Sequence, residues 1–243
     1  MLYPGAGGVP APTISEAVTI VEEGGADLAV VPIENNVFGP VLETLRRLQW
    51  TMLRVRASAV YRVRLVAAGD PGGGVVYSHS QALGEAGEWI RANLPGARLV
   101  PVSSTGEAAL RAARDGGLCI CSREAATRHG LPVVAEDVDG GGNYTRFLVL
   151  GWEDDPGGDR TMILAVLRDE PGSLYRFLEP LALAGVNLSM IYSMPVGGEW
   201  RYIFYLEATG SRLDPRVKEA LAGARRRAVI LNVLGSYRRI VLG

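Results

Sequence analysis

The sequence is poor in cysteine and histidine, has no excess of charge of one sign and contains no long apolar run. Its two cysteines, Cys119 and Cys121, cannot build a disulfide framework, and without a paired set of histidines they are predicted to be small buried residues and not zinc ligands. The 25 basic and 26 acidic side chains give a net charge of −1, so no basic balance points to nucleic acid or an anionic membrane surface. Apolar runs such as residues 28–33 fall far short of the ~20 residues that a membrane span needs.

The beginning of the chain, MLYPGAGG, has neither the basic stretch nor the apolar core of a signal peptide. With 48% hydrophobic and 21% charged residues, the composition is that of a soluble globular chain. A length of 243 residues suits one large domain or two modest ones. We therefore expect a cytoplasmic protein with room for two domains.

Helix-like and strand-like apolar spacings alternate along residues 13–150. Two capping-box signatures, Thr13 with Glu16 and Ser104 with Glu107, mark helix starts. Strands that alternate with helices predict an α/β architecture with mostly parallel strand pairing.

An acidic stretch at residues 153–159, EDDPGGD, has the composition of a linker. After it, the apolar spacing predicts the element order βαββαβ, a ferredoxin-like unit, over residues 160–243. Large side chains alternate along one of its strands, and we interpret them as one face of the sheet or as a dimer contact. These side chains are Trp200, Tyr202, Phe204 and Leu206.

A first polar motif, VPIENN at residues 31–36, follows a buried strand. Ligands bind beyond the carboxyl ends of strands in open α/β sheets, so Glu34, Asn35 and Asn36 are candidates to face a cleft. The alternative is that Asn36 caps the following helix.

A second motif, YSHSQ at residues 77–81, lies where a strand gives way to a helix. Ser78 or Ser80 can cap that helix, and free backbone N–H groups there favour an anion such as a carboxylate. Capping alone accounts for the serines equally well. Gln81 is either a ligand-binding residue or an ordinary side chain of a first helical turn.

A third motif, GGGNYTRF at residues 140–147, lacks the ending of a P-loop and is therefore no nucleotide cradle of that kind. Its glycines indicate a hinge or a turn of close approach, and Thr145 and Arg146 then place a hydroxyl beside a guanidinium. A fixed arginine suits a dicarboxylate substrate, so we interpret Arg146 as a carboxylate receptor or as a support for one.

Together these segments resemble the prephenate dehydratase family, in order and with family-like spacing over residues 13–243. The matching motifs are VPIEN at 31–35, SHSQAL at 78–83 with Ser80 in place of proline, SST at 103–105 and NYTRF at 143–147. The resemblance implies a two-lobed dehydratase domain over residues 1–152 that is similar to periplasmic binding proteins. Lobe A is expected at about 1–58 and 137–152, and lobe B at about 59–136.

The resemblance also implies roles for individual residues. Thr145 is expected at the leaving hydroxyl of the substrate, where it donates a hydrogen bond. Glu34 is a candidate acid only if burial raises its pKa, and Arg146 is counted with these two as a catalytic candidate. The predicted substrate-binding residues are Asn35, Asn36, Ser78, Gln81, Ser104 and Phe147.

Residues 160–243 resemble an ACT regulatory domain, chiefly in PGSL at 171–174 and NLSMI at 187–191. The resemblance implies phenylalanine as effector and a homodimer or homotetramer. The predicted effector contacts are Gly172, Ser173, Leu174, Asn187, Leu188 and Ser193. Where the family has glutamate-serine-arginine-proline, this chain has YSMP at 192–195, so we expect phenylalanine binding to survive with reduced coupling to the cleft.

A second departure lies at the start of the chain. The family's opening glycine-rich turn is reduced to YPGAGG at residues 3–8, and we expect a strand–helix unit that helps to form the cleft to be absent.

The leading hypothesis is decarboxylating dehydration of prephenate to phenylpyruvate in L-phenylalanine biosynthesis, in a cleft between the two lobes. The resemblance implies no metal or organic cofactor and no nucleic-acid or membrane partner. Two alternatives stay open: a catalytically impaired, amino-acid-sensing ACT protein, and a related arogenate dehydratase or prephenate decarboxylase.

Overall fold

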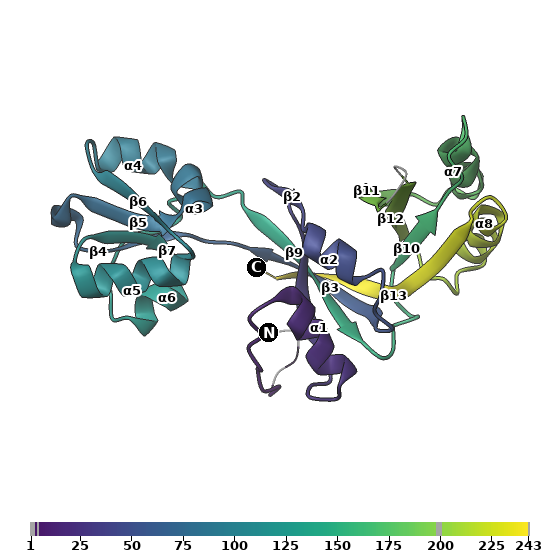
Figure 1. The fold of residues 1–243 in the computed structure, drawn as a ribbon, viewed down its shortest axis with the longest axis horizontal. Helices are drawn as coiled ribbons and strands as arrows, with labels where there is room; N and C mark the ends of the chain where they lie inside the picture. The colour runs from purple at the N-terminus through teal and green to yellow at the C-terminus, as the bar shows by residue number, and fades with distance from the viewer. Residues whose placement is uncertain (1–2, 4, 198–200, 243) are drawn as a thin grey trace. The chain divides into compact units, whose positions relative to one another are not determined.

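The computed structural model describes residues 3, 5–197 and 201–242. The chain folds into two compact units, the first formed by residues 1–61 with 145–243 and the second by residues 62–144. Figure 1 shows their helices and strands. Among the described helices, none is long and apolar enough to cross a membrane.

The first unit is built on an eight-stranded sheet with the order β11-β12-β10-β13-β3-β9-β1-β2. Its strands are β1 (Ala29–Asn35), β2 (Gly39–Pro40), β3 (Arg54–Arg62), β9 (Tyr144–Gly151), β10 (Arg160–Val166), β11 (Leu188–Val196), β12 (Arg201–Thr209) and β13 (Ile230–Leu242). Its helices are α1 (Ile14–Glu22), α2 (Leu42–Arg47), α7 (Ser173–Leu183) and α8 (Pro215–Arg225). From β10 onward the order is βαββαβ, which confirms the expected ferredoxin-like unit.

The second unit has a five-stranded sheet with the order β6-β5-β7-β4-β8. Its strands are β4 (Val66–Gly69), β5 (Val75–His79), β6 (Arg98–Val102), β7 (Leu118–Cys121) and β8 (Val133–Ala135). Helices α3 (Ser80–Glu85) and α4 (Gly87–Asn93) pack on one face, and α5 (Thr105–Asp115) and α6 (Arg123–Arg128) pack on the other (Figure 1). A short 3-10 turn spans Pro71–Gly73.

Both predicted helix starts are confirmed, with Thr13 and Ser104 as the caps. The hydroxyl of Thr13 accepts a hydrogen bond from the N–H of Glu16, and that of Ser104 accepts one from the N–H of Glu107. The Glu107 carboxylate in turn binds the backbone and the hydroxyl of Ser103. These signals were readable because both partners lie within one turn of the chain.

The expectation of mostly parallel pairing is wrong. In the second unit β5 pairs parallel with β6 and β7, but β4 pairs antiparallel with β7 and β8. In the first unit β1 is antiparallel to β2 and β9, and β13 is parallel to β3. Two strands joined by one crossover helix run parallel to each other. Strands β1 and β9 are instead joined by the whole second unit, and a connection of that length does not fix their relative direction.

The lobe boundaries differ from those expected. Residues 137–144 belong to the second unit, because the N–H of Val138 bonds to the carbonyl of Leu65 and the Val138 side chain is buried in that unit. The βαββαβ segment is not a separate unit but shares a sheet with the first lobe. The linker lies against β13, where the N–H of Asp155 bonds to the carbonyl of Ser236.

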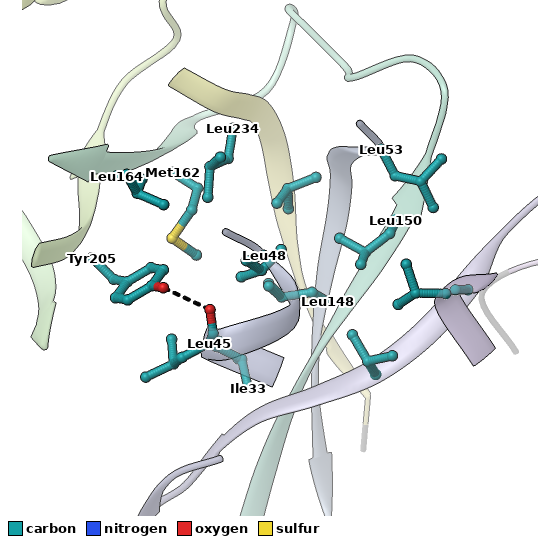
Figure 2. Packing of buried hydrophobic residues seen from close by; sticks show 14 of the residues in the cluster. Ile33, Leu45, Leu48, Leu53, Leu148, Leu150, Met162, Leu164, Tyr205 and Leu234 are labelled. Carbon is teal, nitrogen blue, oxygen red and sulfur yellow. Dashed lines mark hydrogen bonds between the residues drawn. The ribbon is translucent and has the colours of Figure 1, made fainter. Parts of the chain in front are cut away.

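One hydrophobic cluster joins the two halves of the first unit (Figure 2). Ile33 and Leu148 from the first lobe pack with Met162 and Leu164 from the βαββαβ sheet. The Tyr205 hydroxyl donates a 2.6 Å hydrogen bond to the carbonyl of Leu45, at helix α2. The opposite face of the βαββαβ sheet is covered by α7 and α8.

The predicted alternating face along β12 is described only in part, since Trp200 lies outside the described residues. Tyr202 is exposed, Phe204 is half-buried and Leu206 is fully buried against the helices. Phe204 and Leu206 therefore lie on the face of the sheet that α7 and α8 cover.

We predict that Gly235→Ala destabilises the fold by about 3 kcal/mol. Gly235 has φ 152° at an irregularity in the pairing of β13 with β10, and an added Cβ would lie 2.3 Å from the carbonyl oxygen of Val55. Urea unfolding measures the change. In the control Gly84→Ala, inside α3 with open space around it, we expect a gain of up to about 1 kcal/mol. An unchanged midpoint for Gly235→Ala would contradict the close approach.

Candidate active site

Asn35 and Thr145 form the centre of the candidate site in the first unit. Strands β1 and β9 place them opposite each other, and the Asn35 side-chain amide donates a 3.0 Å hydrogen bond to the Thr145 hydroxyl oxygen. The pair sits at the carboxyl end of β1, where the sequence predicted polar side chains.

The orientation of the Asn35 amide is fixed by the turn that follows. Its oxygen accepts hydrogen bonds from the N–H groups of Val37 (2.9 Å) and Phe38 (3.1 Å), so its nitrogen must point to Thr145. Since the Thr145 oxygen accepts from this nitrogen, the hydroxyl proton is left for another acceptor. Asn35 therefore orients Thr145 as a hydrogen-bond donor.

Glu34 and Arg146, the neighbours of this pair in both strands, form a second cross-strand pair. Their ion pair joins Arg146 Nε to Glu34 Oε1 at 2.9 Å. Arg146 lies on the same face of β9 as Leu148, which belongs to the cluster shared with the βαββαβ sheet. An irregularity in the register between Pro32 and Glu34 brings Glu34 opposite Arg146.

Arg146 is buried against Glu207 of strand β12. Its side chain is 2% exposed and that of Glu207 is 0% exposed, and Arg146 Nη1 lies 2.5 Å from Glu207 Oε2. The same carboxylate accepts hydrogen bonds from the hydroxyls of Tyr237 (2.5 Å) and Ser189. Every strong partner of Glu207 is therefore a cation or an O–H donor.

The protonation states follow from these contacts. Burial alone would raise the pKa of Glu207, but Arg146 and the Ser189 and Tyr237 hydroxyls outweigh it and hold the pKa below its usual value. Burial disfavours the charged form of Arg146 and so tends to lower its pKa. The negative charges of Glu207 and Glu34 outweigh this effect, and the pKa of Arg146 is raised. The pKa of Tyr237 is raised well above its ordinary value by burial and by Glu207. The cluster is a charged ion pair with neutral tyrosine.

These contacts bear on the two roles considered for Arg146, a carboxylate receptor or a support for one. Its guanidinium lies between two carboxylates of the protein and beside the sulfur of Met190, so the structure favours a support over a direct receptor for substrate. Glu34 also accepts a 2.7 Å hydrogen bond from the hydroxyl of Tyr192, whose pKa is raised to about 12 by burial and by this contact. The Glu34 carboxyl group therefore contacts one cation and one O–H donor of the protein.

The motif in the second unit has a different local structure from the one expected. The cap of α3 is neither Ser78 nor Ser80 but His79, whose side chain accepts a hydrogen bond from the N–H of Gln81. Ser78 is 0% exposed and its hydroxyl donates to the carbonyl of Ile120, which joins β5 to β7. Gln81 is exposed and its amide donates to Glu85.

The other predicted substrate residues lie in both units. Ser104 is the exposed cap of α5 in the second unit. Phe147 is half-buried in β9, opposite Pro32. Asn36 does not cap α2, because the N-terminal cap of that helix is Val41.

The predicted effector residues gather at two places in the βαββαβ unit. Gly172, with φ 78°, is the cap of α7, and Ser173 and Leu174 form its first turn. Asn187 directly precedes β11, Leu188 is the first residue of that strand, and Ser193 lies further along it, exposed.

Three residues of the Arg146 cluster, Glu207, Ser189 and Tyr237, are missing from the sequence prediction. A signal was present for one of them: Glu207 interrupts the otherwise apolar and aromatic run YIFYLEA of β12. A carboxylate in such a run is buried only when it is paired.

The fold and the site together define a class of protein, in which an α/β domain of two lobes carries a threonine–asparagine pair and continues into a ferredoxin-like regulatory unit. A family model for prephenate dehydratase matches residues 2–155, and one for the ACT domain matches residues 161–226.

Curated relatives agree with both matches. The bifunctional chorismate mutase/prephenate dehydratase of Aquifex aeolicus is 36% identical over 244 residues, which cover 96% of this chain and 67% of the relative. The prephenate dehydratase of Amycolatopsis methanolica is 36% identical over 245 residues, which cover 95% of this chain and 80% of the relative.

Two solved structures have a similar fold over most of the chain. The prephenate dehydratase of Arthrobacter aurescens, in complex with L-Phe, is 35% identical with a TM-score of 0.87, covering 98% of this chain and 84% of that one. GqqA, described as a novel type of quorum quenching acylase, is 26% identical with a TM-score of 0.86, covering 96% of this chain and 90% of that one. The chain belongs to the prephenate dehydratase family and carries an ACT domain.

We predict that Glu207→Gln lowers the free energy of unfolding by about 3 kcal/mol at neutral pH, because the buried Arg146 loses the charge of its nearest carboxylate. Since the pKa of Glu207 is lowered in the folded chain from the usual 4.5, its ionised form stabilises the fold above about pH 4.5. This contribution is lost as the pH falls toward the folded value.

Urea unfolding of the wild type and the variant at neutral pH and below pH 4 tests this sign. The difference between the two proteins should shrink on acidification. Equal differences at both pH values would show that the charge of Glu207 contributes nothing.

Proposed function

We propose that the chain converts prephenate to phenylpyruvate and that Thr145 donates a hydrogen bond to the departing hydroxyl of the substrate. The observation that carries this proposal is the Asn35–Thr145 pair, in which the fixed amide leaves the threonine proton for an outside acceptor. Family membership supplies the substrate class.

The reaction breaks two bonds between the substrate ring and its substituents, one to the carboxylate and one to the hydroxyl. The electron pair of the bond to the ring carboxylate moves into the ring as CO₂ leaves, and the C–O bond of the ring hydroxyl breaks. One proton joins the departing hydroxide to give water, and the ring becomes aromatic. A hydrogen bond to the leaving oxygen stabilises the charge that develops there, and a threonine acts here as a donor and not as a free acid.

In this proposal the Glu34–Arg146 pair supports the site and does not touch the reacting atoms. It lies one residue from Asn35 and Thr145 on both strands and holds β1 to β9. The substrate roles expected of Asn36 and Phe147 in the first unit, and of Gln81 and Ser104 in the second, stay predictions for each unit by itself. The burial of Ser78 favours a structural role for its side chain.

Phenylalanine is the proposed effector of the ACT domain. The relative from Arthrobacter aurescens was solved with L-Phe, and this chain has an ACT domain with the expected elements. The N-terminus of α7, capped by Gly172, offers N–H groups to a carboxylate, and Asn187 offers a short polar side chain at the start of β11.

A homodimer is proposed through β11. This strand is at one end of the eight-stranded sheet, so its outer edge has no neighbouring strand in the described chain. Its side chain Ile191 is exposed, and a second copy of the edge would cover it. The cytoplasmic location stays a prediction.

We predict phenylpyruvate formation from prephenate, measured by the absorbance of the product in alkali, with arogenate assayed in parallel. Thr145→Ala should lower kcat by on the order of 10²-fold, the usual effect of removing one transition-state donor. Thr145→Ser, which keeps the hydroxyl, should retain most of the rate. A Thr145→Ala enzyme within threefold of wild type would remove Thr145 from the mechanism, and no turnover of either substrate would favour the amino-acid sensor.

Titration calorimetry with phenylalanine should give a heat of binding at millimolar ligand, because both proposed contact regions are present. Asn187→Ala should weaken binding by about tenfold, the scale of one hydrogen bond to a charged group. The matched control is Asn93→Ala, an exposed asparagine of the second unit, which should bind as wild type does. Absence of heat in the wild type would contradict the effector proposal.

Light scattering at micromolar concentration should give at least twice the 25.9 kDa of one chain. Ile191→Lys, on the proposed edge, should shift the mass toward the monomer. Val134→Lys, at a similarly exposed position of β8, should not. A monomeric wild type would contradict the dimer.

A further inference from the structure

Glu207 is the point at which three segments of the first unit meet. Its two carboxylate oxygens receive Arg146 from β9, Tyr237 from β13 and Ser189 from β11. Arg160 of β10 is a more distant cation, with Nε 3.9 Å from Glu207 Oε1. A side chain with no exposed surface thus connects the ACT domain to a strand of the dehydratase lobe.

The strand that Glu207 reaches is the one that carries the proposed hydrogen-bond donor. Arg146 and Thr145 are joined by one peptide bond, and their cross-strand partners Glu34 and Asn35 are joined by another. Successive side chains of a strand point to opposite faces. The Glu34–Arg146 pair, held by Glu207, and the Asn35–Thr145 pair, proposed to face the substrate, are therefore on opposite faces but are connected by the same two peptide bonds. We therefore expect a shift of Arg146 to change the orientation of Thr145.

We infer that Glu207 is a positioning residue for the proposed dehydratase reaction, which acts on Thr145 through Arg146 and is linked through Ser189 to the effector strand. The inference rests on the proposed function for the identity of the reaction. The contacts of Glu207 do not depend on that proposal. Small displacements matter here, since about 1 Å of misplacement of a catalytic group can cost on the order of 10²-fold in rate.

The link to the effector strand comes from a local irregularity. The register of β11 against β12 shifts between Leu188 and Met190, and the extra residue is Ser189. This irregularity brings the Ser189 hydroxyl to Glu207, next to the proposed effector residues Asn187 and Leu188. An effector that moves the start of β11 changes a contact of Glu207 directly.

Two variants and a matched control test the inference. Glu207→Gln keeps the size and removes the charge; Ser189→Ala removes only the link to β11. The control is Tyr205→Phe. Tyr205 lies on β12, as Glu207 does, and the substitution removes its buried hydrogen bond to the carbonyl of Leu45 in the dehydratase lobe, which is not on the strand of Thr145. All are assayed at a temperature at which circular dichroism shows them folded.

For Glu207→Gln we expect kcat to fall at least tenfold with KM within threefold, and for Tyr205→Phe we expect both constants within twofold of wild type. For Ser189→Ala we expect a normal heat of phenylalanine binding, but at least fivefold less effect of saturating phenylalanine on the rate, measured relative to the variant's own rate without phenylalanine. A Glu207→Gln enzyme that behaves as Tyr205→Phe does would overturn the positioning role. An unchanged phenylalanine effect in Ser189→Ala would overturn the link.

A readout independent of turnover separates this inference from the proposed function. The methyl signal of Thr145, assigned in the NMR spectrum of methyl-labelled protein by its loss in Thr145→Ser, should shift in Glu207→Gln and stay in Tyr205→Phe. It should also shift on addition of phenylalanine, and less so in Ser189→Ala. If the signal moves as expected while neither prephenate nor arogenate is turned over, the proposed function fails and the positioning role stands. A signal that is identical in wild type and Glu207→Gln overturns the role, whatever the activity.

Discussion

The first unit depends on the burial of one ion pair, Arg146 with Glu207. Removing two charges from water costs several kcal/mol for each, and their attraction offsets this only when the remaining hydrogen-bonding positions are filled. Here Tyr237 and Ser189 fill the Glu207 carboxylate, and Glu34 adds a second ion pair to the guanidinium, although the buried Arg146 Nε makes no hydrogen bond of good geometry. These contacts form only when each contributing strand has its observed register. The strands are β1, β9, β11, β12 and β13, so the ion pair depends on the register of most of the sheet.

Register irregularities make that arrangement possible. A strict alternation would place successive side chains of β1 and β11 on opposite faces. The irregularity before Glu34 brings it opposite Arg146, and the one at Ser189 turns its hydroxyl to Glu207. In β13 a third, beside Gly235, lets the strand pass close to β3 and continue as its parallel neighbour. The ACT domain and the dehydratase lobe therefore share a sheet and the core between its faces, and are one unit.

What the sequence could predict was local. The capping boxes at Thr13 and Ser104, the order βαββαβ and the polar residues after β1 depend on neighbours within a few positions, and the structure has all of them. Strand direction was not predictable, because β1 and β9 are joined by an entire unit. The partner of Arg146 was not predictable either, because Glu207 lies 61 residues away and no spacing rule connects them. His79 became the cap of α3 because Ser78 is held by Ile120, a contact between two strands.

The NYTRF motif combines two tasks because a strand has two faces. Thr145 meets Asn35 on one face, and Arg146 meets Glu34 and Glu207 on the other, so the residue with the proposed catalytic role and the residue of the buried ion pair are adjacent in one motif. An arginine next to a hydroxyl suggested a receptor for substrate carboxylates when only the order of residues was considered. Its burial between protein carboxylates instead makes it the part of the motif through which the ACT domain contacts the strand that carries Thr145. With the proposed role of Thr145, a change in the ACT domain would reach the reaction through Arg146, and no side chain of that domain would need to touch the substrate.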